Sequence, residues 1–133
     1  MKYILLFGPS GCGKTTIAKE ISNYLEDLNI STEVISMDYF YKEGKLESFD
    51  VPSAYDWEYL KKFLIYLKKY NKVNIHPYIY EKYTFDLSLK IPIYKTDVLI
   101  IEGLYSHYAK FLFLQNPIVI YINTPFDICL ARR

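Results

Sequence analysis

The segment after the first apolar stretch combines glycines, a lysine and a hydroxyl residue in a spacing suited to binding phosphate. It reads Gly8-Pro9-Ser10-Gly11-Cys12-Gly13-Lys14-Thr15, is followed by Thr16, and matches G-x-x-x-x-G-K-[ST]. Glycines let backbone N–H groups turn toward phosphate oxygens, because no side chain blocks the approach. Lys14 would add charge at the β- and γ-phosphates, and the Thr15 hydroxyl would bind Mg²⁺. We therefore predict nucleotide binding by residues 8–16, against the alternative of a glycine-rich turn without a ligand.

Two carboxylates come directly after predicted strands. Asp38 follows the strand expected at 33–37, and Glu102 ends the strand expected at 98–101. Ligands of open α/β sheets collect at the carboxyl ends of the strands, so both carboxylates should face the phosphate loop. One can hold Mg²⁺ and another can accept the proton of an attacking hydroxyl. The alternatives are that Asp38 is a turn residue and that Glu102 caps a helix. Beside a phosphate loop, we predict that Asp38 and Lys14 are catalytic, and that Thr15, Asp38 and Glu102 bind the metal.

Other polar residues are given structural roles. Asp97 precedes its strand, at the end away from the predicted site, and Asp56 and Glu58 open a helix whose dipole they favour. His76 and His107 have no spacing typical of metal ligands, so we expect surface or packing roles for them. The tyrosines between residues 78 and 83 could stack on an aromatic substrate, and cross-strand pairing in a hairpin explains them equally well.

The elements that must position these residues alternate along the chain. Unbroken apolar strands are expected at residues 3–7, 98–101 and 118–122, and a further short strand at 33–37. One helix follows the phosphate loop with Ile17, Ile21, Leu25 and Leu28 on one stripe, and a second runs from about 55 to 69 with Trp57, Leu60, Leu64 and Leu67. A polar, aromatic loop reaches Asp50, and a final helix starts near Pro125 behind Thr124, a good N-cap.

Strands alternating with helices predict an α/β fold of the P-loop NTPase type. Its parallel β-sheet should carry helices on both faces, in three layers. The chain is expected to be a single domain, residues 1–133, with a β-hairpin insertion at about 72–94. It is also expected to be truncated at the start of a helix and to lack the lid and the last strand.

The composition is that of an ordinary globular chain of 133 residues, with 51% hydrophobic and 23% charged residues. A net charge of +1 gives no sign of a nucleic-acid or membrane partner. The two cysteines, Cys12 and Cys129, are too few for a disulfide framework or a zinc site, so a reduced, cytoplasmic setting is expected. The short apolar start runs into Gly8 without a cleavage site, which favours a strand over a signal peptide. The oligomeric state stays open, a homo-oligomer included.

The order of these motifs resembles the uridine kinase (uridine–cytidine kinase) family of P-loop kinases. Residues 36–42, Ser-Met-Asp-Tyr-Phe-Tyr-Lys, are similar to its Asp-Ser-Phe-Tyr segment. Residues 49–56, Phe-Asp-Val-Pro-Ser-Ala-Tyr-Asp, resemble its Phe-Asp-His-Pro-x-Ala-Phe-Asp stretch. Residues 97–103 resemble its strand ending in Glu-Gly, and Arg132-Arg133 fall where an Arg-Arg pair begins the helix leading into the lid.

The resemblance implies transfer of the γ-phosphoryl group of ATP or GTP to a ribose 5′-hydroxyl, with Mg²⁺ as cofactor and a nucleoside as partner. Asp38 would be the general base, Glu102 would support the metal, and Asp50 would bind the other sugar hydroxyls. The expected substrate-binding residues are Asp50, Tyr41, Tyr80, Phe85, Arg132 and Arg133. When the family's Pro-x-Tyr-Asp-Phe-x-x-His-x-Arg segment is aligned on Tyr80, Phe85 replaces the histidine that recognises the pyrimidine and Leu87 replaces the arginine. A phenyl ring cannot hydrogen-bond a base edge, so an altered base specificity is expected.

Three functions are compatible with these residues. The first is a nucleoside kinase of the uridine kinase type. The second is a related P-loop kinase with another hydroxyl acceptor, which Phe85 and Leu87 favour. The third is a catalytically silent nucleotide-binding module. The expected lack of the lid favours it, whereas Lys14, Thr15, Asp38 and Glu102 together argue against it.

Overall fold

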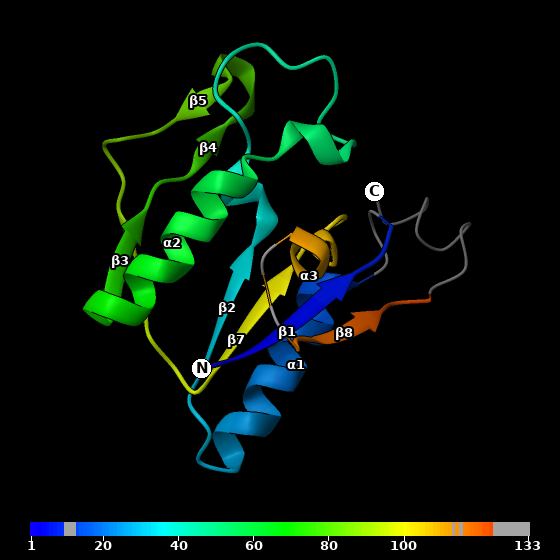
Figure 1. Ribbon diagram of the computed structural model, residues 1–133, viewed down its shortest axis with the longest axis vertical. Helices are drawn as coiled ribbons and strands as arrows, with labels where there is room; N and C mark the ends of the chain where they lie inside the picture. The colour runs from blue at the N-terminus through cyan, green and yellow to red at the C-terminus, as the bar shows by residue number, and fades with distance from the viewer. Residues whose placement is uncertain (10–12, 113, 115, 124–133) are drawn as a thin grey trace. The chain divides into compact units, whose positions relative to one another are not determined.

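The computed structural model describes residues 1–9, 13–112, 114 and 116–123, which form two compact units (Figure 1). The first, which we call the sheet unit, comprises Met1–Ser36 and Thr96–Arg133. The second, the insert unit, comprises Met37–Lys95. The insert unit is therefore one continuous segment, placed in the sequence between two strands of the sheet unit.

A parallel sheet of four strands forms the centre of the sheet unit. The strands are β1 (Lys2–Phe7), β2 (Thr32–Ser36), β7 (Val98–Glu102) and β8 (Ile118–Tyr121), in the spatial order β2-β7-β1-β8. Glu102 lies opposite Leu6 of β1 on one side and opposite Ser36 of β2 on the other. Because the strands are parallel, their carboxyl ends meet at one edge of the sheet. The predicted α/β fold with a parallel sheet is confirmed.

Helix α1 (Lys14–Asp27) covers one face of this sheet. Gly13, with φ 94°, takes the left-handed conformation directly before the helix, a backbone state that glycine adopts without steric cost. Ala18 is fully buried in a cluster with side chains of the sheet, namely Ile4, Leu6, Ile100 and Ile122. Ile17, Ile21 and Leu25 pack against the same cluster. The predicted apolar stripe is thus the surface by which α1 holds the phosphate loop against the sheet.

The opposite face is covered by the segment that follows β7. Phe7 alternates with Leu6 along β1, so its ring points away from α1. That ring stacks on His107, with 3.8 Å between the centroids. Helix α3 (Tyr108–Leu112) begins at the next residue, and α1 and α3 lie on opposite sides of the sheet in Figure 1. This short helix, which the apolar pattern did not predict, supplies the third layer of the sheet unit.

The insert unit contains the longer helix α2 (Trp57–Tyr70). Asp56 caps it by accepting the N–H of Tyr59 at 3.0 Å, and Asn71, with φ 65°, ends it. Its buried residues are Leu60, Phe63, Leu64 and Leu67. The helix starts two residues later than predicted, because residue 55 is extended and residue 56 is the cap.

Short extended pieces and 3₁₀ turns make up the rest of the insert unit. Strand β3 (Lys72–Ile75) pairs antiparallel with β6 (Ile91–Tyr94), and β4 (Tyr78–Ile79) pairs antiparallel with β5 (Thr84–Phe85). The 3₁₀ turns are η1 (Met37–Phe40), η2 (Pro52–Ala54) and η3 (Tyr80–Lys82). Asp38, expected in an irregular loop, therefore lies in the first turn of η1.

The predicted final helix near Pro125 lies outside the described residues. Within the part of the chain that the structure describes, no helix is long and apolar enough to cross a membrane.

Candidate functional site

The phosphate loop joins the carboxyl end of β1 to the first turn of α1. Lys14 opens the helix, and its Nζ donates to the Gly8 carbonyl at 3.0 Å and to the Pro9 carbonyl at 2.9 Å. Thr15 and Thr16 are exposed in the same first turn. The first N–H groups of a helix and its positive dipole end favour anions, so phosphate can bind here without a side chain from elsewhere. The predicted residues Ser10, Gly11 and Cys12 lie outside the described part of the chain.

Glu102 ends β7 at the same edge of the sheet. Its side chain is 7% exposed, which is unusual for a carboxylate and indicates a functional or paired group. The backbone around it is anchored, because the Gly103 N–H donates to the Leu6 carbonyl at 3.0 Å. Ser106 Oγ donates to the same carbonyl at 2.8 Å. The carboxylate is therefore held beside the strand that leads into the phosphate loop.

The donor set of the sheet unit fits Mg²⁺. The hydroxyl of Thr15 and the carboxylate of Glu102 are both hard oxygen donors, which Mg²⁺ prefers. Among the described residues, no group of three or more His, Cys, Asp or Glu side chains is placed to hold a metal ion. Mg²⁺ in phosphoryl-transfer sites needs no such cage, since phosphates and water provide most of its ligands. Residues that could hold it are thus present.

In the insert unit, two tyrosine hydroxyls converge on Asp38. The Tyr41 hydroxyl lies 3.3 Å from Asp38 Oδ1, and the Tyr80 hydroxyl also hydrogen-bonds the Asp38 side chain. Burial raises the pKa of Tyr41, and burial, followed by the negative charge of Asp38, raises the pKa of Tyr80. Both hydroxyls therefore keep their protons at neutral pH and can act as donors. They orient the carboxylate that the sequence identified as the candidate base.

Tyr41 is also the centre of an aromatic cluster. Its ring is stacked on Tyr55, with centroids 4.7 Å apart and an angle of 17°, and meets Phe49 edge-on at 4.9 Å. Tyr78 and Tyr80 complete what we call the tyrosine cluster, at 5.4 and 5.8 Å from the Tyr41 ring. Edge-to-face and offset contacts at these distances are favourable beyond the area they bury. Tyr41, Tyr55 and Tyr78 are buried, so Tyr80, which is 42% exposed, and the half-buried Phe49 are the rings of the cluster that a bound molecule could contact.

Asp50, the residue expected to bind sugar hydroxyls, is exposed in the loop next to Phe49. Hydrogen bonds join the loop that leads there to β5. The Gly44 N–H donates to the Tyr83 carbonyl at 2.9 Å, and Thr84 Oγ1 donates to Glu43 Oε2 at 2.7 Å. The loop is therefore fixed at its start. Phe49 and Asp50 belong to the same unit as Asp38.

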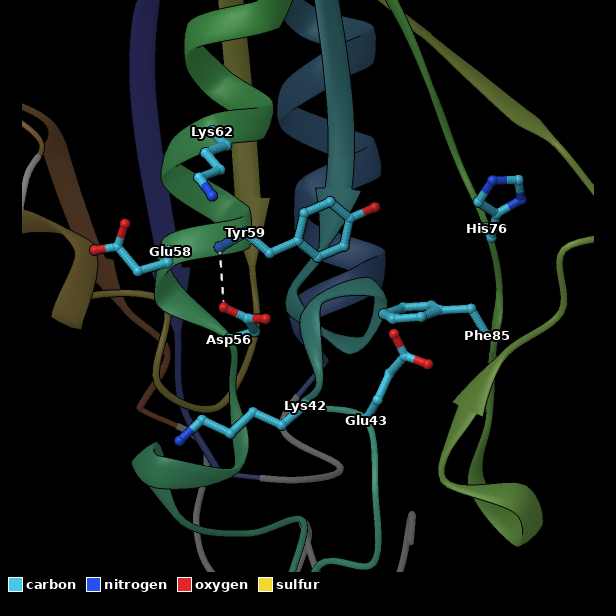
Figure 2. A pocket seen from close by; sticks show the side chains of 8 residues that line it. All are labelled: Lys42, Glu43, Asp56, Glu58, Tyr59, Lys62, His76 and Phe85. Atoms are coloured by element: carbon cyan, nitrogen blue, oxygen red, sulfur yellow. Dashed lines mark hydrogen bonds between the residues drawn. The ribbon is translucent and has the colours of Figure 1, made fainter.

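Phe85 lies elsewhere in the insert unit. Its ring meets Tyr59 and Tyr78 edge-on, at 5.8 and 5.3 Å. Figure 2 shows Phe85 and Tyr59 pointing toward each other in a groove of about 710 Å³. The groove is lined by Lys42, Glu43, Asp56, Glu58, Tyr59, Lys62, His76 and Phe85. Of the predicted site residues, this lining contains Phe85 but not Tyr41, Asp50 or Tyr80.

The structure also brings Tyr83 to Phe49. The two rings are nearly parallel, at 10°, with 5.8 Å between centroids. Tyr83 has φ 52°, an unusual conformation for a bulky residue, and it turns the chain between η3 and β5. No site role was predicted for Phe49 or Tyr55, whereas Tyr83 was among the tyrosines that could stack on an aromatic substrate or pair in a hairpin. The signal for Phe49 was its place directly before Asp50, and the contact of Tyr55 with Tyr41 could be found only from the fold.

Of the remaining residues considered in the sequence, the two histidines lie in the part of the chain that the structure describes. His107 packs against Phe7, as a packing role requires, and burial lowers its pKa. His76 Nδ1 lies 2.7 Å from the carbonyl of Leu89. Arg132 and Arg133, expected to bind substrate, lie outside the described part of the chain.

The model of the phosphoribulokinase/uridine kinase family matches residues 3–133. The uridine kinase of Ureaplasma parvum serovar 3 is 36% identical over 138 residues, which cover 98% of this chain and 66% of that protein. The uridine-cytidine kinase A of Dictyostelium discoideum is 35% identical over 133 residues, which cover 95% of this chain and 26% of that protein. The chain thus spans just under two thirds of the length of the bacterial relative.

Solved structures agree on the fold. A protein from Silicibacter sp. TM1040, described as a fructose transport system kinase, aligns with a TM-score of 0.74 at 21% identity. The alignment covers 98% of this chain and 69% of that one. A "possible uridine kinase" from Bacillus stearothermophilus aligns with a TM-score of 0.67 at 24% identity, over 99% of this chain and 76% of that one. At these identities the structural comparisons establish the shared fold.

Proposed function

Because the chain belongs to the phosphoribulokinase/uridine kinase family, we propose that it transfers the γ-phosphoryl group of ATP or GTP to the 5′-hydroxyl of a nucleoside of the uridine or cytidine type. The observation that carries the proposal is Asp38, a carboxylate held by the Tyr41 and Tyr80 hydroxyls beside the tyrosine cluster. A base that accepts a hydroxyl proton must be oriented toward it, and an aromatic base of a nucleoside needs a surface on which to stack. The insert unit offers both.

The sheet unit would hold the phosphate donor. Backbone N–H groups of residues 8–16 and the dipole of α1 favour the phosphate oxygens, and Lys14 adds a positive charge at the β- and γ-phosphates. Mg²⁺, held by Thr15 and Glu102, would supply charge neutralisation at the transferring phosphate. The protein contributes position and charge rather than a covalent intermediate.

The insert unit would hold the acceptor. As the acceptor oxygen forms its bond to the γ-phosphorus, the bond to the β-γ bridging oxygen breaks, and the acceptor's proton passes to Asp38. Asp50 would hydrogen-bond the other sugar hydroxyls. The rings of the tyrosine cluster would pack against the base. Phe85 stays a candidate for base contact, as do Arg132 and Arg133 for phosphate contact.

A coupled assay of ADP release tests the proposal. With ATP and Mg²⁺, we expect turnover with uridine or cytidine among a panel of nucleosides and other small alcohols. Turnover with another alcohol only would reassign the acceptor within the same family. Binding of ATP without turnover on any acceptor would contradict the proposal and favour a nucleotide-binding module. Calorimetric titration with a non-hydrolysable ATP analogue measures that binding independently.

A further inference from the structure

A buried tyrosine hydroxyl lies behind the group that orients Asp38. Tyr55 is 1% exposed, and its hydroxyl lies 3.3 Å from the hydroxyl of Tyr41. A phenol is transferred out of water at a cost unless its hydroxyl is hydrogen-bonded. The ring of Tyr55 could pack on Tyr41 without any hydroxyl, and the family segment that residues 49–56 resemble has phenylalanine at this place. The hydroxyl is therefore the feature of this chain that needs an explanation.

The backbone fixes the distance between the two tyrosines. Tyr41 and Tyr55 form an antiparallel bridge. Backbone hydrogen bonds flank it on both sides, from the Lys42 N–H to the Ala54 carbonyl at 2.9 Å and from the Asp56 N–H to the Phe40 carbonyl at 2.6 Å. Tyr55 also directly precedes Asp56, the cap of α2, so the start of the helix restrains it further. The bridge thus places the two side chains next to each other, and the stacking of their rings at 4.7 Å brings the hydroxyls together.

The number of protons and acceptors around the Tyr41 hydroxyl indicates which group donates in each hydrogen bond. Tyr41 has one O–H and three oxygens within reach: Asp38 Oδ1 at 3.3 Å, the Phe49 carbonyl at 3.4 Å and the Tyr55 hydroxyl at 3.3 Å. Asp38 as a carboxylate and the carbonyl can only accept. A hydrogen bond to an ionised acceptor is stronger than one to a neutral acceptor, which favours Asp38 as the partner. Tyr41 then has no proton left for Tyr55, which favours Tyr55 as the donor of the hydrogen bond between the two hydroxyls.

We infer that Tyr55 is a positioning residue, whose hydroxyl donates to Tyr41 and thereby keeps the Tyr41 proton directed at Asp38. The inference rests on the proposed function, in which Asp38 accepts the proton of the acceptor hydroxyl. Hydrogen bonds in series strengthen one another, so the Tyr55 hydroxyl reinforces the bond that orients the base. The distances of 3.3 Å are long for hydroxyl donors, as is common for catalytic groups before substrate binds, and we expect them to shorten in the substrate complex.

We call the hydrogen bonds that run from Tyr55 through Tyr41 to Asp38 the relay. Steady-state kinetics of Tyr55→Phe, Tyr41→Phe and the double variant test it. Tyr55→Phe keeps the stacked ring, so it should fold, and it should lower kcat about three- to tenfold, the range of one hydrogen bond, with the KM for ATP unchanged. In the Tyr41→Phe background, the same change should lower kcat no further, because Tyr55 acts through Tyr41. Equal factors in both backgrounds, or an unchanged kcat of Tyr55→Phe, would overturn the inference.

Tyr59→Phe is the matched control. It removes a half-buried hydroxyl from the same unit, from a ring that contacts Phe40 at 5.1 Å, and its kcat should equal that of the unchanged chain. A measurement without turnover separates the relay from the proposed function. The ¹H resonance of the Tyr41 hydroxyl should move in Asp38→Asn and also in Tyr55→Phe. If it moves in neither, the relay is absent, whether or not the chain phosphorylates a nucleoside.

Discussion

The sheet unit and the insert unit build their functional groups in opposite ways. The phosphate loop of the sheet unit is one continuous segment, and most of its proposed contacts come from backbone N–H groups at the start of α1. The tyrosine cluster of the insert unit draws its side chains from separate segments, at residues 41, 49, 55, 78 and 80. Backbone chemistry tolerates changes of side chain, whereas a cluster of rings and hydroxyls changes with each substitution. The comparison implies that the proposed donor binding depends little on the identity of most side chains and that the proposed acceptor binding depends strongly on it.

The largest effect should come from removing the one charged side chain of the phosphate loop. Lys14→Ala deletes the ammonium group expected at the β- and γ-phosphates, together with its hydrogen bonds to Gly8 and Pro9. We expect triphosphate binding to fall below detection in a calorimetric titration. Binding of a nucleoside acceptor should persist, because the groups proposed to bind the acceptor lie in the insert unit.

Lys19→Ala controls for the loss of a positive charge on the same helix, since Lys19 is exposed on α1. Its affinity for ATP should equal that of the unchanged chain. An unchanged affinity of Lys14→Ala would remove the phosphate-loop assignment and, with it, the division of labour between the units.

A loss of transfer without a loss of donor binding is expected from Asp38→Asn. The amide keeps an acceptor oxygen for Tyr41 and Tyr80, so the cluster should stay folded, while the basic carboxylate is gone. We expect kcat to fall by ~10²–10³, the usual size for one placed catalytic charge, and the affinity for ATP to stay unchanged. Single-turnover kinetics with saturating ATP measures the step directly.

Asp86→Asn is the matched control, because Asp86 is an exposed carboxylate of the same unit. Hydrogen bonds from Ser88 lower its pKa, so it too is a charged side chain held by hydroxyl and backbone donors. Its kcat should be that of the unchanged chain. Turnover of Asp38→Asn at the same rate would rule out Asp38 as the base and weaken the role given to the insert unit.

The contrast between the sheet unit and the insert unit also explains which features could be predicted from the sequence. The sequence pattern predicted the four strands of the sheet unit, and the glycine-lysine pattern predicted the phosphate loop, because both depend on neighbours in the chain. Asp38 and Glu102 were chosen by a rule about the carboxyl ends of parallel strands. Such local signals predicted the α/β fold, which is confirmed, and the residues proposed to bind the donor, which stay a prediction.

The arrangement of the insert unit depends on contacts between distant residues, and no local pattern encodes it. Tyr55 was placed in the first turn of a helix, yet it is an extended residue paired with Tyr41. Tyr83 meets Phe49 because its left-handed backbone turns the chain after η3. A tyrosine in the sequence does not predict that conformation. Phe85 was chosen by aligning a motif, and its ring contacts Tyr59 and Tyr78. The acceptor side was therefore predictable in its residue types and not in its geometry.

A moderate effect on stability should follow from Gly44→Ala, at the turn where the insert unit's loop meets β5. Gly44 has φ 93°, which an L-residue adopts only with strain, although nothing lies within 4 Å of an added Cβ. The free energy of unfolding should fall by about 1–2 kcal/mol, from the backbone alone. Denaturant titration measures it. Gly44→Asn should lose less, because asparagine tolerates left-handed backbone; equal losses would mean that the conformation carries no strain.

The smallest effect should be a change in how stability depends on pH, caused by His107. Its ring stacks on Phe7 in the segment that covers the second face of the sheet. Its Nδ1 is buried and has no hydrogen-bond partner among the described residues, and burial lowers its pKa from 6.5. As the pH falls through 6.5, the unfolded chain takes up the proton first. Stability should therefore decline below pH 6.5 and stop declining once the pH is below the pKa of the folded state.

His107→Phe keeps a ring on Phe7 and removes the titrating nitrogen, so its unfolding free energy should fall less between pH 7 and pH 5 than that of the unchanged chain. His76→Asn is the control at the other histidine. It keeps a donor for the Leu89 carbonyl, and its unfolding free energy should fall between pH 7 and pH 5 as much as that of the unchanged chain. If His107→Phe and the unchanged chain lose stability in parallel, carboxylates account for the whole decline. The packing of the sheet unit at Phe7 would then not depend on the protonation of His107.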